Sequence, residues 1–152
     1  LEFRRVLFRS EVDARIRATA LEKFGPVRSV RPTLVFTNLV DFDQEYGHRR
    51  NVAGYAGALE HFDTLLPSLL GRLGPDDLAV FCADHGNDPT WPGTDHTREE
   101  VPILAFGAAA PRRERADLGV RDGFFDVAQT LCDGFGLPAW PRGRSFLAAA
   151  LP

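Results

Sequence analysis

The sequence has little cysteine, little net charge and no long apolar run, and each shortage excludes a class of protein. Two cysteines, Cys82 and Cys132, in 152 residues are too few for a disulfide-stabilised scaffold. Both fall in predicted regular elements, so we expect buried free thiols in a reducing compartment, the cytoplasm. The net charge of −3 gives no reason to expect nucleic acid as a partner. No apolar run approaches the ~20 residues that span a bilayer, so we expect no membrane partner.

What remains is the composition of an ordinary globular domain. The chain is 44% hydrophobic and 26% charged, within the range of soluble proteins. Its length is that of one domain, which can bury about two thirds of its unfolded surface. The sequence shows no internal repeats.

Apolar periodicity predicts strands and helices that alternate along the chain. The predicted strands are 33–40, 78–83 and 101–107, and the predicted helices are 11–23, 52–73, 126–135 and 144–151. We expect Pro67 to kink its helix or to start a second one. Strand–helix–strand spacing of this kind predicts an α/β fold with parallel pairing and right-handed crossovers.

Two of the predicted strands run directly into loops that carry carboxylates and imidazoles. The strand 78–83 is followed by Asp84 and His85, with His96 eleven positions after His85. The strand 33–40 is followed by a loop with Asp43 and His48. Open α/β sheets bind ligands at the carboxyl ends of their strands.

Mixed oxygen and nitrogen donors suit a divalent transition metal. The candidate ligands are Asp43, His48, Asp84, His85 and His96, with Asp41 and Asp95 nearby. The spacing alone leaves a second interpretation open, in which both loops are solvated turns with capping aspartates.

Two stretches carry a resemblance to a known family. They are Asn38-Leu-Val-Asp-Phe-Asp-Gln-Glu-Tyr-Gly-His-Arg-Arg50 and Ala83-Asp-His-Gly-Asn-Asp-Pro-Thr-Trp-Pro-Gly-Thr-Asp-His-Thr-Arg-Glu99. Both resemble carboxy-terminal motifs of the phosphopentomutases, a family of the alkaline-phosphatase superfamily. Asp-His-Gly alone fits the whole superfamily, and the residues that follow it narrow the resemblance. The likeness is strong over residues 33–107 and continues weakly to the end.

The resemblance implies a parallel-sheet, alkaline-phosphatase-like core. It also implies two bound divalent metal ions, for which Mn²⁺ is the expected metal. Asp43, His48 and His96 would bind one ion, and Asp84 and His85 would bind the other. The implied reaction interconverts (deoxy)ribose 1-phosphate and (deoxy)ribose 5-phosphate through a phosphothreonine enzyme, so a sugar phosphate is the expected partner.

The resemblance also implies that part of such an enzyme is absent here. The family's first metal-binding Asp, its phosphorylated Thr and its cap domain have no counterpart. Residues 1–10 match nothing in the family at this place, so we expect them to be a non-native leader, with the start of an amphipathic helix as the alternative. We expect residues 11–152 to be the carboxy-terminal part of the metal-binding catalytic core. No catalytic nucleophile is present, so we expect the chain alone to be inactive.

Other residues and functions stay open at this point. Arg49, Arg50 and Arg98 could bind phosphate or pair with neighbouring glutamates. Asp41 could orient a ligand histidine or cap a turn, and Trp91 is expected to pack over the metal site. The functional alternatives are another phosphotransferase or hydrolase of the superfamily and a non-catalytic metal-binding module.

Overall fold

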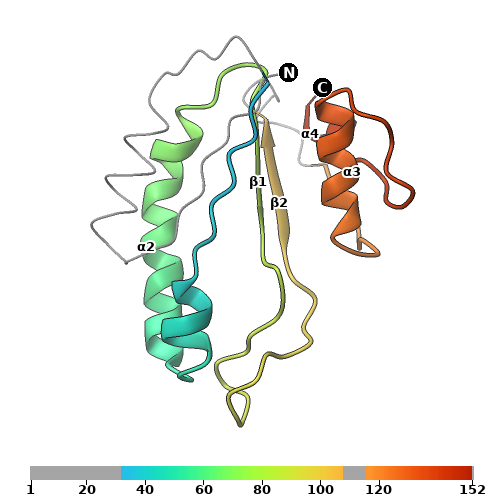
Figure 1. Ribbon diagram of the computed structural model, residues 1–152. Coiled ribbons are helices and arrows are strands. Elements are labelled where there is room, and N and C mark those ends of the chain that lie inside the picture. The colour runs from blue at the N-terminus through green and yellow to red at the C-terminus, as the bar shows by residue number, and fades with distance from the viewer. Residues whose placement is uncertain (1–31, 108–115, 152) are drawn as a thin grey trace.

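The computed structural model describes residues 32–107 and 116–151. Its elements are, in chain order, η2 (Phe42–Gly47), α2 (Val52–Leu70), β1 (Leu78–Cys82), β2 (Ile103–Gly107), α3 (Phe125–Gly134) and α4 (Leu147–Ala150). The helix predicted over 11–23 and the leader predicted over 1–10 lie outside the described residues. In Figure 1, η2 and α2 lie on one side of the two strands, and α3 and α4 lie on the other.

The two strands pair antiparallel, with Leu78 opposite Gly107 and Cys82 opposite Ile103. Both strands were predicted, but the parallel pairing predicted for them was wrong. A parallel pair needs a crossover connection, which is usually a helix. Residues 83–102 contain no helix, and they fold back on themselves through a bridge between Gly86 and Thr97. The chain therefore returns beside β1 in the opposite direction.

The strand predicted over 33–40 was also wrong, because this segment has no regular secondary structure. Figure 1 shows it running along β1 as an extended trace, and Leu34 packs against the apolar core. An apolar run predicts that a segment is partly buried, but a strand also needs a hydrogen-bonding partner. Among the described residues, β1 and β2 pair only with each other.

The long helix α2 confirms the periodicity of the sequence. The side chain of Asn51 accepts a hydrogen bond from the backbone of Gly54 at 2.9 Å and so caps the first turn,. The helix continues through Pro67 to Leu70, so no second helix starts at the proline. Pro67 lies in the final turn, where the loss of one backbone donor disturbs few bonds. The helix faces the sheet through Phe62, whose ring centroid lies 5.8 Å from that of Phe81.

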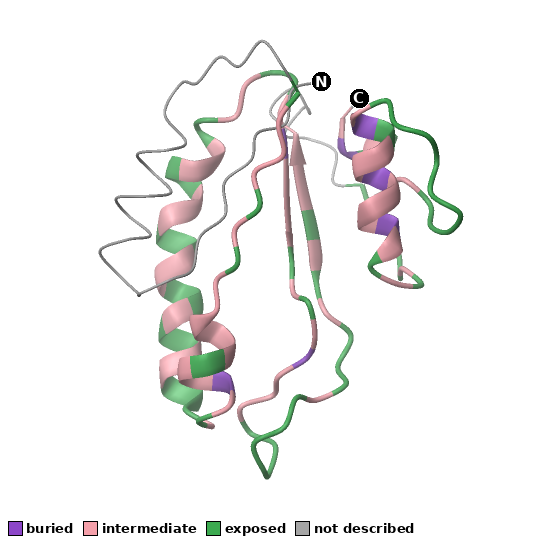
Figure 2. Ribbon diagram, in the orientation of Figure 1, coloured by how far each residue is buried: buried purple, intermediate pink, exposed green. Residues whose placement is uncertain are grey.

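The two carboxy-terminal helices lie close to the predicted ranges. α3 is offset by one residue from the predicted 126–135, and α4 covers only the middle of the predicted 144–151. The buried apolar core of the described residues consists of Leu78, Phe146 and Ala150, with a shell of partly buried side chains. Figure 2 shows buried residues on α3 and α4 but none on α2. Within residues 32–107 and 116–151, the best-packed part is therefore the layer between β1 and the carboxy-terminal helices.

A buried polar cluster fixes this layer. Asp126 is 2% exposed. Its Oδ1 accepts a hydrogen bond from the backbone of Arg144 at 2.8 Å, and its Oδ2 pairs with Arg121 Nη1 at 3.2 Å. Thr130 Oγ1 donates to the Asp126 carbonyl and accepts from the backbone of Phe146 at 3.0 Å. Because the side-chain oxygens of Asp126 and Thr130 all have partners, the cluster joins α3 to the segment before α4 without leaving these oxygens unpaired.

We predict that Asp126→Ala lowers the free energy of unfolding by about 3 kcal/mol or more, because Arg121 loses its partner in a largely buried place. Urea denaturation measures this loss. Asp133→Ala is the matched control on the same helix, since Asp133 is exposed and its side chain accepts from Ser145; it should cost less than about 1 kcal/mol. Equal losses from the two variants would contradict the role given to Asp126.

Candidate metal centre

The candidate ligands come from two segments of the chain, one that precedes α2 and one that follows β1. Asp43 lies in η2, and His48 follows η2 directly. Residues 41–50 were expected to form a loop, but part of this range is a π-helix, a rare element that is frequent at functional sites. Asp84 and His85 follow β1, and the bridge between Gly86 and Thr97 brings His96 back beside them.

Three of the five predicted ligands face one another. His48 Nε2 lies 3.4 Å from Asp43 Oδ2, and His96 Nε2 lies 3.3 Å from Asp43 Oδ1. The two imidazole nitrogens are 3.1 Å apart. Ligands placed about 2.1 Å from a metal in a tetrahedron are about 3.4 Å from one another. The spacing of Asp43, His48 and His96 therefore fits one divalent ion.

His85 joins this group, and Asp84 lies at its edge. The His85 ring stacks on His96 with centroids 3.7 Å apart. Ligand atoms of Asp43, His85 and His96 also lie within 4.8 Å of one another. Asp84 Oδ1 is 3.6 Å from His85 Nε2, and the Asp84 side chain is 76% exposed. The contacts thus give a compact group of four residues, and Asp84 reaches it only through His85.

The hydrogen bonds of the histidines leave the correct nitrogens available for a metal. His48 Nδ1 contacts the carbonyl of Thr94, and His85 Nδ1 contacts the carbonyl of Gly86. A carbonyl only accepts, so each Nδ1 donates a proton there, and in the neutral imidazole the lone pair is then on Nε2. Both Nε2 atoms face a carboxylate of the candidate site. This donor set fits a divalent metal.

Two residues organise the site: Arg50, which was expected to bind phosphate or pair with a glutamate and donates instead to amide oxygens, and Asn87, which the sequence left unassigned. Arg50 donates to the carbonyls of Asp88 at 2.8 Å and Asp95 at 2.6 Å, and also to the carbonyls of Gly47 and Gly93. Its Nη1 donates to Asn87 Oδ1 at 2.8 Å, and Asn87 Nδ2 donates to Asp43 Oδ1 at 2.6 Å. The available signal was the position of Asn87 beside Asp84-His85-Gly86, since an amide can both donate and accept.

The remaining candidates lie outside this group. Arg49 forms an ion pair with Glu45 at 3.0 Å, which was one of the two roles predicted for it. The side chain of Asp41 makes no cap hydrogen bond to η2. Arg98 is exposed, and Asp95 contributes a backbone carbonyl to Arg50. Trp91 is 58% exposed, so the expectation that it packs over the site was wrong; Gly93, with φ 90°, turns the loop beyond it.

Three groups near the site, Tyr55, Cys82 and Asp88, have shifted pKa values. Burial raises the pKa of Tyr55, and the charge of Asp43 adds to the shift. Partial burial also raises the pKa of Cys82, with a contribution from Asp84. Cys82 and Cys132 are free thiols as predicted, but Cys82 is exposed, not buried. Hydrogen bonds from Thr90 lower the pKa of Asp88.

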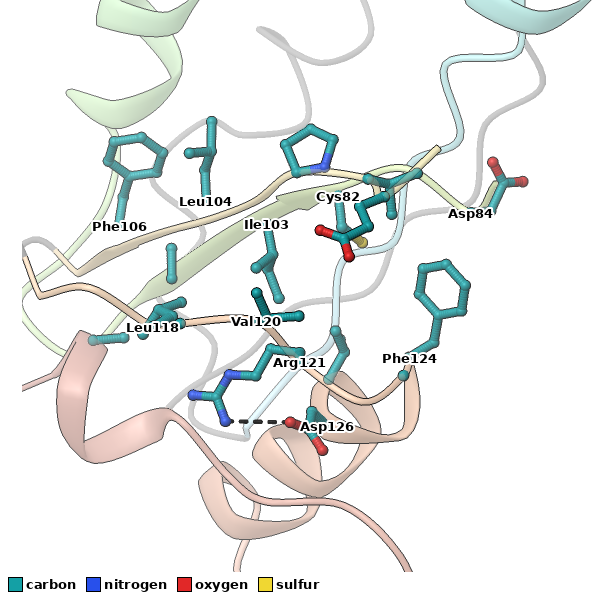
Figure 3. A pocket seen from close by; sticks show the side chains of 18 of the residues that line it. Cys82, Asp84, Ile103, Leu104, Phe106, Leu118, Val120, Arg121, Phe124 and Asp126 are labelled. Carbon is teal, nitrogen blue, oxygen red and sulfur yellow. Dashed lines mark hydrogen bonds and ion pairs between the residues drawn. The ribbon is translucent and has the colours of Figure 1, made fainter. Parts of the chain in front are cut away.

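A groove begins at the edge of the site and continues along β2. Asp84 and His85 line one end, and the rest lies between β2 and the segment before α3, with a volume of about 1480 Å³. Figure 3 shows Leu104, Val120 and Phe124 around it. These three side chains are 52%, 76% and 53% exposed. The groove is therefore a large, mostly apolar surface that the described residues do not cover.

Comparisons with known proteins agree with the donor set. Residues 14–139 match the family called Metalloenzyme, described as the Metalloenzyme superfamily. The chain belongs to the Metalloenzyme superfamily.

Within this superfamily the chain is similar to curated phosphopentomutases. It is 52% identical to that of Hahella chejuensis over 131 residues, which are 86% of this chain and 31% of the relative. It is 49% identical to that of Shewanella loihica over 144 residues, 90% of this chain and 35% of the relative. With that of Rhizobium etli the identity is 57% over 75% of this chain and 27% of the relative. The chain thus spans about a third of the length of these relatives.

These findings agree with the α/β class predicted from the sequence. In the part of the chain that the structure describes, no helix has the length and apolar character to cross a bilayer.

We predict that this chain binds a divalent metal ion through Nε2 of His48 and of His96. The test is a Zn²⁺ titration monitored by the ¹⁵N chemical shifts of the imidazoles. The Nε2 signals of His48 and His96 should move, and Nδ1 of His48 and of His85 should stay protonated. His61, on α2, is the control and should not respond. A shift of His48 Nδ1 in place of Nε2 would contradict the tautomer deduced from Thr94.

Proposed function

We propose that this chain is the carboxy-terminal part of the catalytic core of a phosphopentomutase. The whole enzyme would interconvert (deoxy)ribose 1-phosphate and (deoxy)ribose 5-phosphate in the cytoplasm, where Cys82 and Cys132 stay reduced. The observation that carries the proposal is the meeting of Asp43, His48 and His96 in a chain about half identical to phosphopentomutases.

The proposed role of these residues is to bind and orient two divalent ions, Mn²⁺ by preference. Asp43, His48 and His96 would bind one ion, as their mutual distances of 3.1 to 3.4 Å support. Asp84 and His85 would bind the other, together with residues from elsewhere in the enzyme. When bound, two such ions polarise a phosphoryl oxygen and neutralise the charge that develops during transfer.

The chain's own groups supply the fixed geometry of the proposed site. The Thr94 and Gly86 carbonyls hold His48 and His85 with Nε2 toward the carboxylates. Asn87 holds one oxygen of Asp43 and leaves the other to His48. The phosphorylated Thr, and the cap domain that excludes water, are proposed to belong to the rest of the enzyme.

We also propose that the rest of the core domain covers the apolar groove and extends the two strands into a larger, mostly parallel sheet. The relatives are about three times as long as the matched segment, so they have enough further chain to do so. The large exposed side chains of Leu104, Val120 and Phe124 support this, because contiguous exposed apolar surface marks an interface.

We predict that His96→Ala lowers mutase activity of the full-length protein at least about 100-fold while the melting temperature of the metal-free protein changes little. His96 lies in an exposed part of its loop and supplies a donor, not core packing. Turnover of ribose 1-phosphate at limiting Mn²⁺ measures the effect, with His61→Ala as the control. Wild-type turnover in the His96 variant would exclude His96 as a ligand.

We predict that Leu104→Asp destabilises the full-length protein by about 2 kcal/mol or more, since it buries a charge if the groove is covered. Leu137 is the matched control, because it is 58% exposed compared with 52% for Leu104 and does not line the groove. Leu137→Asp should change stability by less than about 0.5 kcal/mol. Equal effects in denaturant unfolding would show that the groove stays open.

A further inference from the structure

The strongest unexplained feature is the guanidinium of Arg50. It is half-buried, and its acceptors are the carbonyls of Gly47, Asp88, Gly93 and Asp95 and the side-chain amide of Asn87. All of these acceptors are neutral amide oxygens. A guanidinium has five N–H donors, and these contacts use Nε, both hydrogens of Nη1 and one of Nη2. Too little remains for a bidentate bond to a phosphate.

The backbone of Arg50 strengthens this argument. Its φ is 53°, and among the described residues it is the one non-glycine residue with a positive φ. This left-handed conformation favours glycine. An arginine in such a place is held by its side-chain contacts, since strained backbone persists where the surroundings determine it.

Two routes lead from Arg50 to the candidate ligands. In the first, Arg50 fixes the Asn87 amide oxygen, so that the amide nitrogen points at Asp43 Oδ1. In the second, Arg50 binds the carbonyls of Gly93 and Asp95. These residues flank Thr94, whose carbonyl accepts from His48.

In the first of these routes, the absence of a side chain at Gly47 leaves space for the Asn87 amide. A Cβ placed on Gly47 would collide with the Asn87 amide. Gly47 has no positive φ, so a side chain there is excluded by contacts and not by backbone conformation: the Cβ would overlap the Asn87 amide nitrogen and would lie 2.9 Å from the Phe42 carbonyl oxygen. The helical turn before Arg50 and the loop after β1 are thus shaped around this amide.

We propose that Arg50 and Asn87 are positioning residues that set the metal affinity of the Asp43, His48 and His96 group without touching substrate. This rests on the proposed function, because it takes that group to be a metal site. Loss of the Arg50 contacts would release the Asp43 carboxylate and the Thr94 carbonyl together, and partners of this kind typically change metal affinity 10–100-fold.

The test is Mn²⁺ calorimetry and mutase kinetics on the full-length protein with Arg50→Lys, which keeps the charge but removes the fork of donors. Affinity for Mn²⁺ should fall about 10–100-fold. Saturating Mn²⁺ should restore kcat, and KM for the sugar phosphate should not change. Arg49→Lys is the control, because Arg49 is exposed and pairs with Glu45; it should behave as wild type.

A second pair of variants keeps Arg50 intact. Gly47→Ala should displace Asn87 and lower Mn²⁺ affinity in the same way. Gly57→Ala is its control, since a Cβ there meets nothing within 4 Å. This pair decides the question if Arg50→Lys fails to fold.

Four results would overturn the proposal. A raised KM with unchanged Mn²⁺ affinity in Arg50→Lys would make Arg50 a phosphate-binding residue. A lower melting temperature of the metal-free protein with unchanged Mn²⁺ affinity would make it merely structural. If the wild-type protein bound no Mn²⁺, the proposed function would fail as well; if wild type and both variants bound equally, this inference alone would fail.

Discussion

The hydrogen bonds of one arginine connect the two halves of the candidate site. Asp43 and His48 precede α2, whereas His85 and His96 follow β1, so nothing local brings them together. Arg50, between His48 and α2, donates to carbonyls on both sides of the loop after β1. The donors then meet at 3.1 to 3.4 Å. Because like-charged or lone-pair groups at this distance repel unless a cation or proton lies between them, such an arrangement is stable in the company of a metal.

The rest of the described chain supports the candidate site. It is well packed on one side of the sheet and poorly packed on the other. On one side, Asp126 and Thr130 tie α3 to the segment before α4 with fully paired polar groups. On the other, α2 contains no buried residue and contacts the sheet through a ring pair. A two-stranded sheet is marginal by itself, and the apolar core of the described residues has three buried members. The rest of the core domain, which we proposed covers the sheet and groove, would supply the apolar contact that these elements lack.

The sequence predicted the parts of this structure that depend on local pattern. The periodicity of apolar residues predicted α2, α3 and both strands, and the positions of His48, His85 and His96 after apolar runs predicted that they would lie close together. Pairing direction depends instead on where the chain goes next, and the loop 83–102 returned without a helix. The segment 33–40 has the composition of a strand, yet among the described residues it pairs with no strand. Trp91 was expected to pack over the metal site because it lies between two prolines, but its side chain is 58% exposed.

The role of Arg50 shows why a site is harder to predict than its ligands. Ligand chemistry is a property of the residue type, so Asp43 and His48 are visible as candidates in the sequence. The work of Arg50 is a property of geometry, since its acceptors are backbone carbonyls that every residue possesses. Nothing in the sequence separates it from Arg49, whose side chain lies on the surface beside Glu45. What separates them is a single backbone angle: a φ of 53° turns the Arg50 side chain away from the helix surface and into the loop that carries His96.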